Sequence, residues 1–229
     1  MVIPKRTLEV ERPVTLAVVG SHSTGKTTFL RQLTERLRRK RIQAALVNDL
    51  GARAQQIGLP ILYAHTWAST LWIMTRGISN ELEAWRNADV VLVDRGIPDA
   101  LGYYEAALEY RGRRPDPRRI EQLERIVTDH SPNYDLVLRT VLDPDVPLGA
   151  DKPRDTDMRF RRMADRHVGR VLNRLGIIHA VLPFDGHDRA IVEAMALVEG
   201  RLAAPDEEFS WGDPEGPAGT SAVEASWPI

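Results

Sequence analysis

The sequence predicts an α/β protein in which helices cover both faces of a parallel sheet. Short apolar runs rich in β-branched residues alternate with longer segments of helical periodicity, which is the pattern of repeated strand–helix units. The chain has 229 residues, of which 43% are hydrophobic, enough for one full core. No internal repeat is present in the sequence. We therefore expect one domain over residues 1–204, built on five strands.

Each expected strand is a short apolar run, and in chain order they are 14–20, 42–47, 89–94, 134–141 and 177–182. The first and third runs are apolar almost throughout, as is usual for strands buried on both faces. The expected helices carry apolar residues at steps of three and four. They are the segment that follows residue 26, then 52–57, 63–87, 97–110, 116–129, 156–175 and 187–202.

Composition excludes several classes of protein. The chain has no cysteine, which rules out disulfides, thiolate metal sites and cysteine nucleophiles. It has no run of 18 apolar residues and begins without the pattern of a secretory signal, so we expect a cytoplasmic protein with no membrane span. The 31 basic and 32 acidic residues leave a formal charge of -1, which argues against a dedicated nucleic-acid binder.

This charge is divided unevenly along the chain. Residues 205–229 hold six acids and no base, which leaves 31 basic and 26 acidic residues, a charge of +5, in the body before them. The segment is rich in Pro and Gly and has little periodicity, so we expect an acidic, flexible tail. Its Phe209, Trp211 and Trp227 leave open that it docks on the body or on a partner.

Residues 20–27, Gly-Ser-His-Ser-Thr-Gly-Lys-Thr, match the pattern G-x-x-x-x-G-K-[ST] of a phosphate-binding loop. The match lies between a buried strand and a helix, where loop amides and the helix N-terminus both face an anion. Lys26 would then reach the β- and γ-phosphates, and the Thr27 hydroxyl would bind Mg²⁺. The residues that we expect to bind the nucleotide here are Gly20, Ser23, Thr24, Gly25, Lys26, Thr27 and Thr28.

A second charged motif, Asp94-Arg95-Gly96, closes the third strand. Ligands of open α/β sheets bind beyond the carboxyl ends of the strands, so Asp94 is expected beside the phosphate loop as a Mg²⁺-side carboxylate. Arg95 is suited to grip a phosphate or to orient an acceptor hydroxyl. The alternative for Arg95 is a structural salt bridge between neighbouring residues.

The loop GSHSTGKT and the stretch DRGIPDALGY at 94–103 resemble the P-loop kinases of nucleosides and nucleotides, over roughly residues 14–200. Thymidylate and deoxynucleoside kinases carry an acid–arginine pair at this place, and a group of AAA-like P-loop proteins that includes nicotinamide riboside kinase-type domains looks most similar. The resemblance implies the P-loop NTPase fold, with a five-stranded parallel sheet in the order 2-3-1-4-5. It also implies a general base after the second strand, which here is Asp49. Such kinases often have Glu at this position, so three roles are open for Asp49: general base, carboxylate beside Mg²⁺, or helix cap. Either Asp49 or Asp94 would accept the proton of the acceptor hydroxyl.

An arginine-rich segment lies between the fourth and fifth strands, and we expect it to form a lid at about 145–165. Small kinases fold such lids over the phosphates to neutralise the charge of the transferring group. Lys152, Arg154 and Arg159 are the candidates for this phosphate grip, and Arg162 is a further candidate for nucleotide binding. Arg159, Arg162 and Arg166 would share one helix face, with Asp155 or Thr156 as its N-cap. The alternative is a solvated arginine face.

The combined motifs predict an enzyme that transfers the γ-phosphate of ATP, or of another NTP, with Mg²⁺ to a nucleoside, nucleotide or similar hydroxyl compound. The alternatives are a nucleotide-binding regulatory NTPase that acts through a protein partner, and a kinase that modifies an antibiotic or another secondary metabolite. The expected partner is thus a small-molecule acceptor, and a homodimer is left open. The expected catalytic residues are Lys26, Asp49, Asp94, Arg95, Arg154 and Arg159, and Gln55, Tyr63, His65, Trp67, Trp72 and Arg76 are available to the acceptor.

Overall fold

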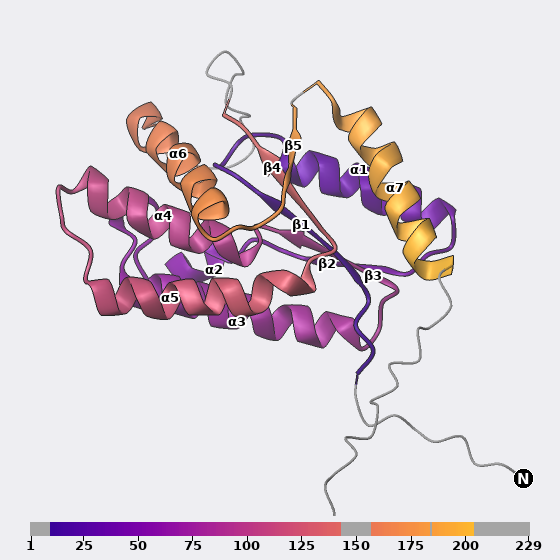
Figure 1. Ribbon diagram of the computed structural model, residues 1–229, viewed down its shortest axis with the longest axis horizontal. Helices are drawn as coiled ribbons and strands as arrows, with labels where there is room; N and C mark the ends of the chain where they lie inside the picture. Colours follow the sequence, from indigo (N-terminus) through magenta and orange to yellow (C-terminus); the bar gives the residue numbers. More distant parts are fainter. Residues whose placement is uncertain (1–9, 143–156, 184, 204–229) are drawn as a thin grey trace, which may run out of the picture.

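Five parallel strands form the centre of the structure, in the order β2-β3-β1-β4-β5 (Figure 1). The computed structural model describes residues 10–142, 157–183 and 185–203. The strands are β1 (Val14–Val19), β2 (Ala44–Val47), β3 (Val90–Asp94), β4 (Leu136–Thr140) and β5 (Ala180–Leu182). All neighbouring strands pair in parallel, and β1 lies between β3 and β4. The expected fold class and strand order are confirmed.

Helices cover both faces of this sheet, on opposite sides in Figure 1. Ala17 and Val19 of β1 belong to a core shared with α3, α4, α5 and α6, whereas Leu16 and Val18 point to a second core shared with α1 and α7. Successive side chains of a strand point to opposite faces of the sheet, so this alternation shows that β1 is buried on both faces. The helices are α1 (Lys26–Arg39), α2 (Gly51–Gln56), α3 (Trp67–Trp85), α4 (Ile97–Tyr110), α5 (Pro117–His130), α6 (Met158–Arg174) and α7 (His187–Ala203), with short 3₁₀ turns at Leu62–Ala64 and Ser131–Asn133.

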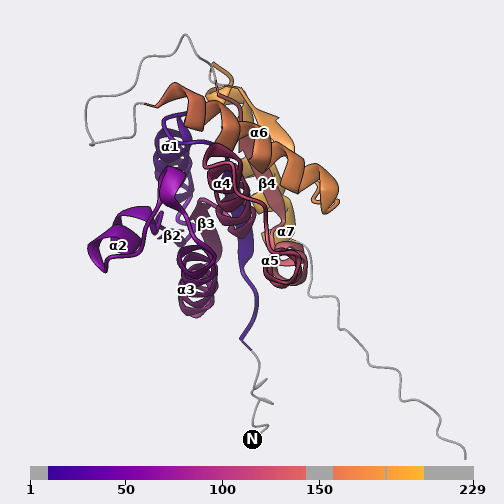
Figure 2. The ribbon, with the colours of Figure 1, turned by 90° about the vertical axis from the view of Figure 1, so that its left-hand side faces the viewer.

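Helix α4 packs against both α3 and α6, and it lies between them in Figure 2. At Gly102, a Cβ atom would lie 2.8 Å from the backbone nitrogen of Val168, so the backbones of α4 and α6 are almost in contact there. Only glycine allows this approach without moving one of the helices. This close crossing holds α6 against α4. Because α4 begins directly after the Asp94-Arg95-Gly96 motif, α6 is also held close to that motif.

Several predicted boundaries differ from the observed ones, and three of the differences have a local reason. Ile177–His179 are not part of β5, because the Ile177 amide still donates to Leu172 O of α6, at 2.9 Å. The long helix begins at Trp67 and not at residue 63, because Thr66 and Ser69 form a capping box. The N-cap of α6 is Asp157, in place of Asp155 or Thr156, because its side chain accepts from the Arg159 and Phe160 amides.

In the part of the chain that the structure describes, no helix is both long enough and apolar enough to span a membrane.

Candidate active site

The phosphate loop of residues 20–27 connects the end of β1 to the start of α1. Gly20, Ser23 and Gly25 have positive φ angles of 132°, 61° and 89°. A Cβ at Gly20 would lie 2.3 Å from Oγ1 of Thr140 on β4, so this position needs glycine both for its backbone angle and for space. Thr24 Oγ1 lies 2.6 Å from the same Thr140 oxygen, which ties the loop to β4.

Lys26 is buried inside this loop, with 5% of its surface exposed. Its Nζ donates to Gly20 O at 3.0 Å, to Thr24 Oγ1 at 3.3 Å and to Ser21 O. Burial lowers the pKa of Lys26 to about 8, and the charge of Arg95 adds to this effect while nearby carboxylates oppose it. At neutral pH the ammonium group is therefore still mainly charged, and it lies among carbonyl oxygens with which phosphate oxygens would compete.

Thr27 and Asp94 are in contact at the edge of the loop. The Thr27 hydroxyl donates to Asp94 Oδ2 at 2.8 Å, and Thr27 and its neighbour Thr28 are exposed in the first turn of α1. Hydroxyl and carboxylate oxygens are ligands that Mg²⁺ prefers, and in kinases it takes further ligands from phosphate and water. The pair therefore fits a Mg²⁺ ion that comes with the nucleotide. Within the described residues, no group of three or more His, Asp or Glu side chains is arranged to hold a metal ion.

Arg95 connects three parts of the site. Its Nε donates to Asp49 Oδ2 at 2.8 Å, and its NH1 donates to Asp99 Oδ2 at 3.1 Å and to Gly20 O at 3.3 Å. The guanidinium also lies over the Tyr103 ring, 4.9 Å from its centroid. Arg95 has a φ of 76°, in the left-handed region that non-glycine residues rarely adopt. Arg95 of the predicted acid–arginine motif is thus held by two carboxylates, Asp49 from the loop after β2 and Asp99 from α4.

The two carboxylates on Arg95 differ in their surroundings. The Asp49 side chain is 44% exposed, whereas that of Asp99 is 3% exposed. Partial burial works to raise the pKa of Asp49, but the charges of Arg95 and Lys26 and the Gly51 amide together lower it. Burial raises the pKa of Asp99 to about 6 against the opposing charges of Arg95 and Lys26. Asp49 therefore offers an ionised carboxylate to solvent, while Asp99 is internal and also accepts the Gly20 amide at 2.7 Å.

An aromatic cluster lies beside Arg95. Tyr103 has ring-centroid distances of 5.8 Å to His65, 6.0 Å to Phe160 and 6.5 Å to His22. Its hydroxyl oxygen accepts the His22 amide of the phosphate loop at 2.8 Å. Tyr63 joins the cluster through Phe160, at 6.4 Å, and keeps 48% of its surface exposed. The structure therefore brings one of the predicted acceptor-side residues, His65, close to Arg95, and it connects Tyr63 to Arg95 only through Phe160 and Tyr103.

The arginines of α6 lie in different surroundings, and the roles predicted for Arg159 and Arg162 stay predictions. Arg161 is the one that reaches the phosphate loop: it is 2% exposed, and its NH2 donates to His22 O at 3.2 Å. Arg159 is exposed and lies over the Tyr110 ring at 5.2 Å, and Arg162 is exposed at the same end of the helix. The lid itself, with Lys152 and Arg154, falls mainly within 143–156, outside the described residues, and stays a prediction.

Two further side chains do not point to the site. Arg166 pairs with Glu109 of α4. Trp67 donates from its indole nitrogen to Gln122 Oε1 at 3.2 Å, and Arg119 lies over its ring at 5.2 Å, so it faces α5. Trp67 is therefore part of the packing between α3 and α5, and Gln55, Trp72 and Arg76 remain predictions for the acceptor side.

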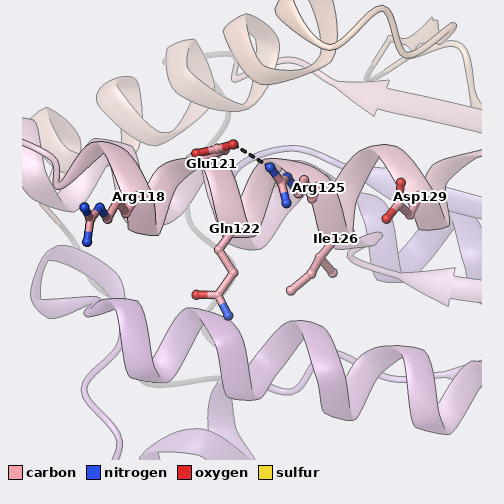
Figure 3. A pocket seen from close by; sticks show the side chains of 6 residues that line it. All are labelled: Arg118, Glu121, Gln122, Arg125, Ile126 and Asp129. Atoms are coloured by element: carbon pink, nitrogen blue, oxygen red, sulfur yellow. Dashed lines mark hydrogen bonds and ion pairs between the residues drawn. The ribbon is translucent and has the colours of Figure 1, made fainter.

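A surface groove of about 330 Å³ lies along α5, and no residue of the phosphate loop lines it (Figure 3). Its lining residues are Arg118, Glu121, Gln122, Arg125, Ile126 and Asp129. Arg125 and Glu121 are paired with each other at 2.6 Å, and Gln122 holds Trp67. Three of the six lining side chains are therefore engaged with each other or with α3, and nothing in the groove points to a ligand.

Three residues of the site were not selected by sequence reasoning: Asp99, Tyr103 and Arg161. Asp99 and Tyr103 follow Arg95 at steps of four, so one helix face that continues from the motif could have identified them. Arg161 gives no such signal, because it lies among four arginines between 159 and 166. Its burial follows from how α6 packs on α4.

These features together define a P-loop nucleotide-binding protein with the architecture of the nucleoside and nucleotide kinases: a strand–loop–helix phosphate site, a facing acid at the end of β3, and the sheet order 2-3-1-4-5. The chain belongs to the AAA domain family, whose model matches residues 15–189. No curated protein matches this chain.

Solved structures, among them two kinases, share this fold. The protein is similar to NadR in complex with NAD and AMP-PNP, with a TM-score of 0.59 and 17% identity over 87% of this chain and 52% of that one. This chain therefore spans about half the length of NadR. Deoxyadenosine kinase from M. mycoides with bound dATP gives a TM-score of 0.56 and 10% identity, over 83% of this chain and 100% of that chain. Thymidylate kinase from Candida albicans gives a TM-score of 0.53 and 15% identity, over 83% of this chain and 93% of that chain.

Proposed function

We propose that this protein is an ATP- and Mg²⁺-dependent kinase that transfers the γ-phosphoryl group to a hydroxyl group of a nucleoside, nucleotide or similar small molecule. One observation carries the proposal. At the carboxyl edge of the sheet, the phosphate loop meets an exposed carboxylate, Asp49, that is paired with Arg95 at 2.8 Å. A phosphate loop alone serves many kinds of NTPase, whereas an acid–arginine pair beside it provides a place for a second substrate.

The donor side is formed by the phosphate loop. Lys26 and the loop amides would bind the phosphates, and the buried Arg161 adds a second positive charge behind the loop at His22. Thr27 and Asp94 supply the oxygen ligands for Mg²⁺. When bound, Mg²⁺ neutralises part of the charge on the phosphoryl oxygens.

The acceptor side is formed by Asp49 and Arg95. The acceptor oxygen forms a bond to the γ-phosphorus while the bond from that phosphorus to the bridging oxygen breaks, so that ADP leaves and the hydroxyl proton passes to a carboxylate. We assign this carboxylate to Asp49, because Asp94 is already engaged by the Thr27 hydroxyl. Asp49 is ionised at neutral pH, and its main effect would be to orient the hydroxyl, since phosphoryl transfer depends chiefly on positioning.

The test is a phosphotransfer assay with purified protein, ATP and Mg²⁺, in which phosphorylated products are detected by mass spectrometry over a panel of nucleosides, nucleotides and hydroxylated metabolites. We expect at least one product and a loss of at least about 100-fold in Lys26→Ala. Lys40→Ala is the matched control, because Lys40 is an exposed lysine paired with Glu199 on the surface. ATP hydrolysis without any phosphorylated acceptor would favour a regulatory NTPase, and an active Lys26→Ala would overturn the site.

A further inference from the structure

The positive charge of Arg95 is already compensated within the protein. Asp49 and Asp99 both pair with its guanidinium, at 2.8 and 3.1 Å, and Gly20 O accepts a further hydrogen bond at 3.3 Å. Its remaining face lies over the Tyr103 ring. An arginine that binds a substrate phosphate usually offers two parallel N–H groups to it. Here the Nε and NH1 donors of Arg95 are directed at the carboxylates of Asp49 and Asp99.

The charges around Arg95 are unfavourable for a second phosphate. Among the described residues, Asp49, Asp94 and Asp99 contribute three carboxylates, and the cations that act on Asp49 and Asp99 are Arg95 and Lys26. Lys26 lies inside the phosphate loop, where it would serve the donor nucleotide. A phosphate on the acceptor would therefore meet the exposed Asp49 carboxylate and have to displace it from Arg95.

The same arrangement suits a hydroxyl group well. Asp49 is an ionised acceptor of hydrogen bonds that is 44% exposed, and the adjacent Arg95 donates hydrogen bonds. A hydroxyl group both donates and accepts, so it can join the pair without separating it. A phosphate carries about two negative charges at neutral pH, so it would have to replace the Asp49 carboxylate in its pair with Arg95.

We propose that the acceptor carries a free hydroxyl group and no phosphate where it meets Asp49 and Arg95, which makes the protein a kinase of nucleoside-like compounds and not of nucleotides. The inference rests on the proposed function for the position of the acceptor. Specificity arises by exclusion, because the carboxylate that orients the hydroxyl also repels an acceptor phosphate. The Asp49–Arg95 pair is the element that distinguishes the two substrate classes.

The test measures binding, so that it does not depend on turnover. The full chain is saturated with Mg²⁺ and AMP-PNP, which occupies the donor site, and calorimetry then gives dissociation constants for matched pairs of a nucleoside and its 5′-monophosphate: thymidine, adenosine and nicotinamide riboside. We expect the nucleoside of the binding pair to be favoured by at least about tenfold. A monophosphate that binds as tightly as its nucleoside, or no preference in any pair, overturns the proposal.

Asp49→Asn tests whether the ion pair is the cause of this preference. The variant removes one of the two carboxylates from Arg95, so the preference for the nucleoside should fall by about tenfold or reverse. Asp129→Asn is the matched control, because it removes an equal charge from the exposed surface of α5 and should leave the preference unchanged. An unchanged preference in Asp49→Asn refutes the role of the pair. If the bound nucleoside is not phosphorylated when ATP replaces AMP-PNP, the proposed function fails while the binding preference stands.

Discussion

The imidazole of His65 should make the stability of the fold depend on pH between about 4 and 6.5. His65 is 5% exposed, and its Nδ1 donates to Leu62 O at 3.1 Å. Burial lowers the pKa of His65 from 6.5 to about 4; the charges of Arg95 and Arg111 act in the same direction, and the Leu62 carbonyl opposes them. The folded protein therefore keeps this imidazole neutral at a pH where the unfolded chain has already bound a proton.

The sign and size of the effect follow from this difference in pKa. Below pH 6.5 the unfolded state binds one proton more than the folded state, so the free energy of unfolding decreases as the pH falls. The contribution of His65 is complete above pH 6.5 and is lost progressively down to about pH 4. A depression of this size corresponds to about 3 kcal/mol over the whole window.

Urea denaturation of the wild type and of His65→Gln, followed by circular dichroism at several pH values from 4 to 7.5, measures this contribution. Glutamine keeps a donor for Leu62 O and does not titrate. Other groups titrate in both proteins, so the relevant quantity is the difference between their two pH profiles. We expect the wild type to lose about 3 kcal/mol more than the variant between pH 7 and pH 4. Parallel profiles would refute the neutral, buried state of His65.

Three further substitutions test the phosphate loop and its support. Gly20→Ala should lower the free energy of unfolding by about 3 kcal/mol or more, because the added Cβ would overlap Thr140. Gly58 also has a positive φ, of 82°, but has open space around it, so Gly58→Ala should lower this free energy by only about 1 kcal/mol. Equal losses for the two variants in urea denaturation would contradict this reasoning. Thr27→Ala should abolish the effect of Mg²⁺ on nucleotide affinity in calorimetry, and Thr27→Ser should keep it; an unchanged Mg²⁺ effect in Thr27→Ala removes this hydroxyl from the site. Arg161→Lys should destabilise the fold by about 2 kcal/mol, since a buried charged hydrogen bond to the loop is lost, and the exposed Arg170→Lys serves as the control that should change little; similar values for both would show that Arg161 is not held as described.

Local patterns in the sequence were sufficient for the sheet and for the phosphate loop. The apolar runs of β1 and β3, the glycine loop and the terminal Asp94 all depend on neighbouring residues, and the structure places Thr27 beside Asp94 as their positions at the strand ends predict. The strand order itself was implied by the family resemblance. Asp49 and Arg95, 46 residues apart, were both identified, but their mutual ion pair was not.

Contacts that helices α4 and α6 make with the phosphate loop could not be predicted from local sequence patterns. Asp99 looks like an ordinary first-turn acid of α4, and only the fold shows that it is buried between the Gly20 amide and Arg95. The sequence analysis selected Arg159 and Arg162 from the arginines of α6, and it did not identify Arg161, which is buried against the loop where α6 packs on α4. Burial of a charged side chain depends on tertiary packing, which a single sequence does not contain.

The central place of β1 also has a consequence for how the protein folds. Within the described residues, β1 pairs with strands far away in the chain, and its end is held by distant side chains: Asp99 binds Gly20, 79 residues before it, and Thr140 binds Val19, 121 residues before it. Because closing such long loops costs entropy, we expect the phosphate loop to gain its shape only when α4 and β4 have packed against β1. Nucleotide binding would accordingly stabilise the domain as a whole, and a nascent chain would become able to bind a nucleotide only after β4 has been synthesised.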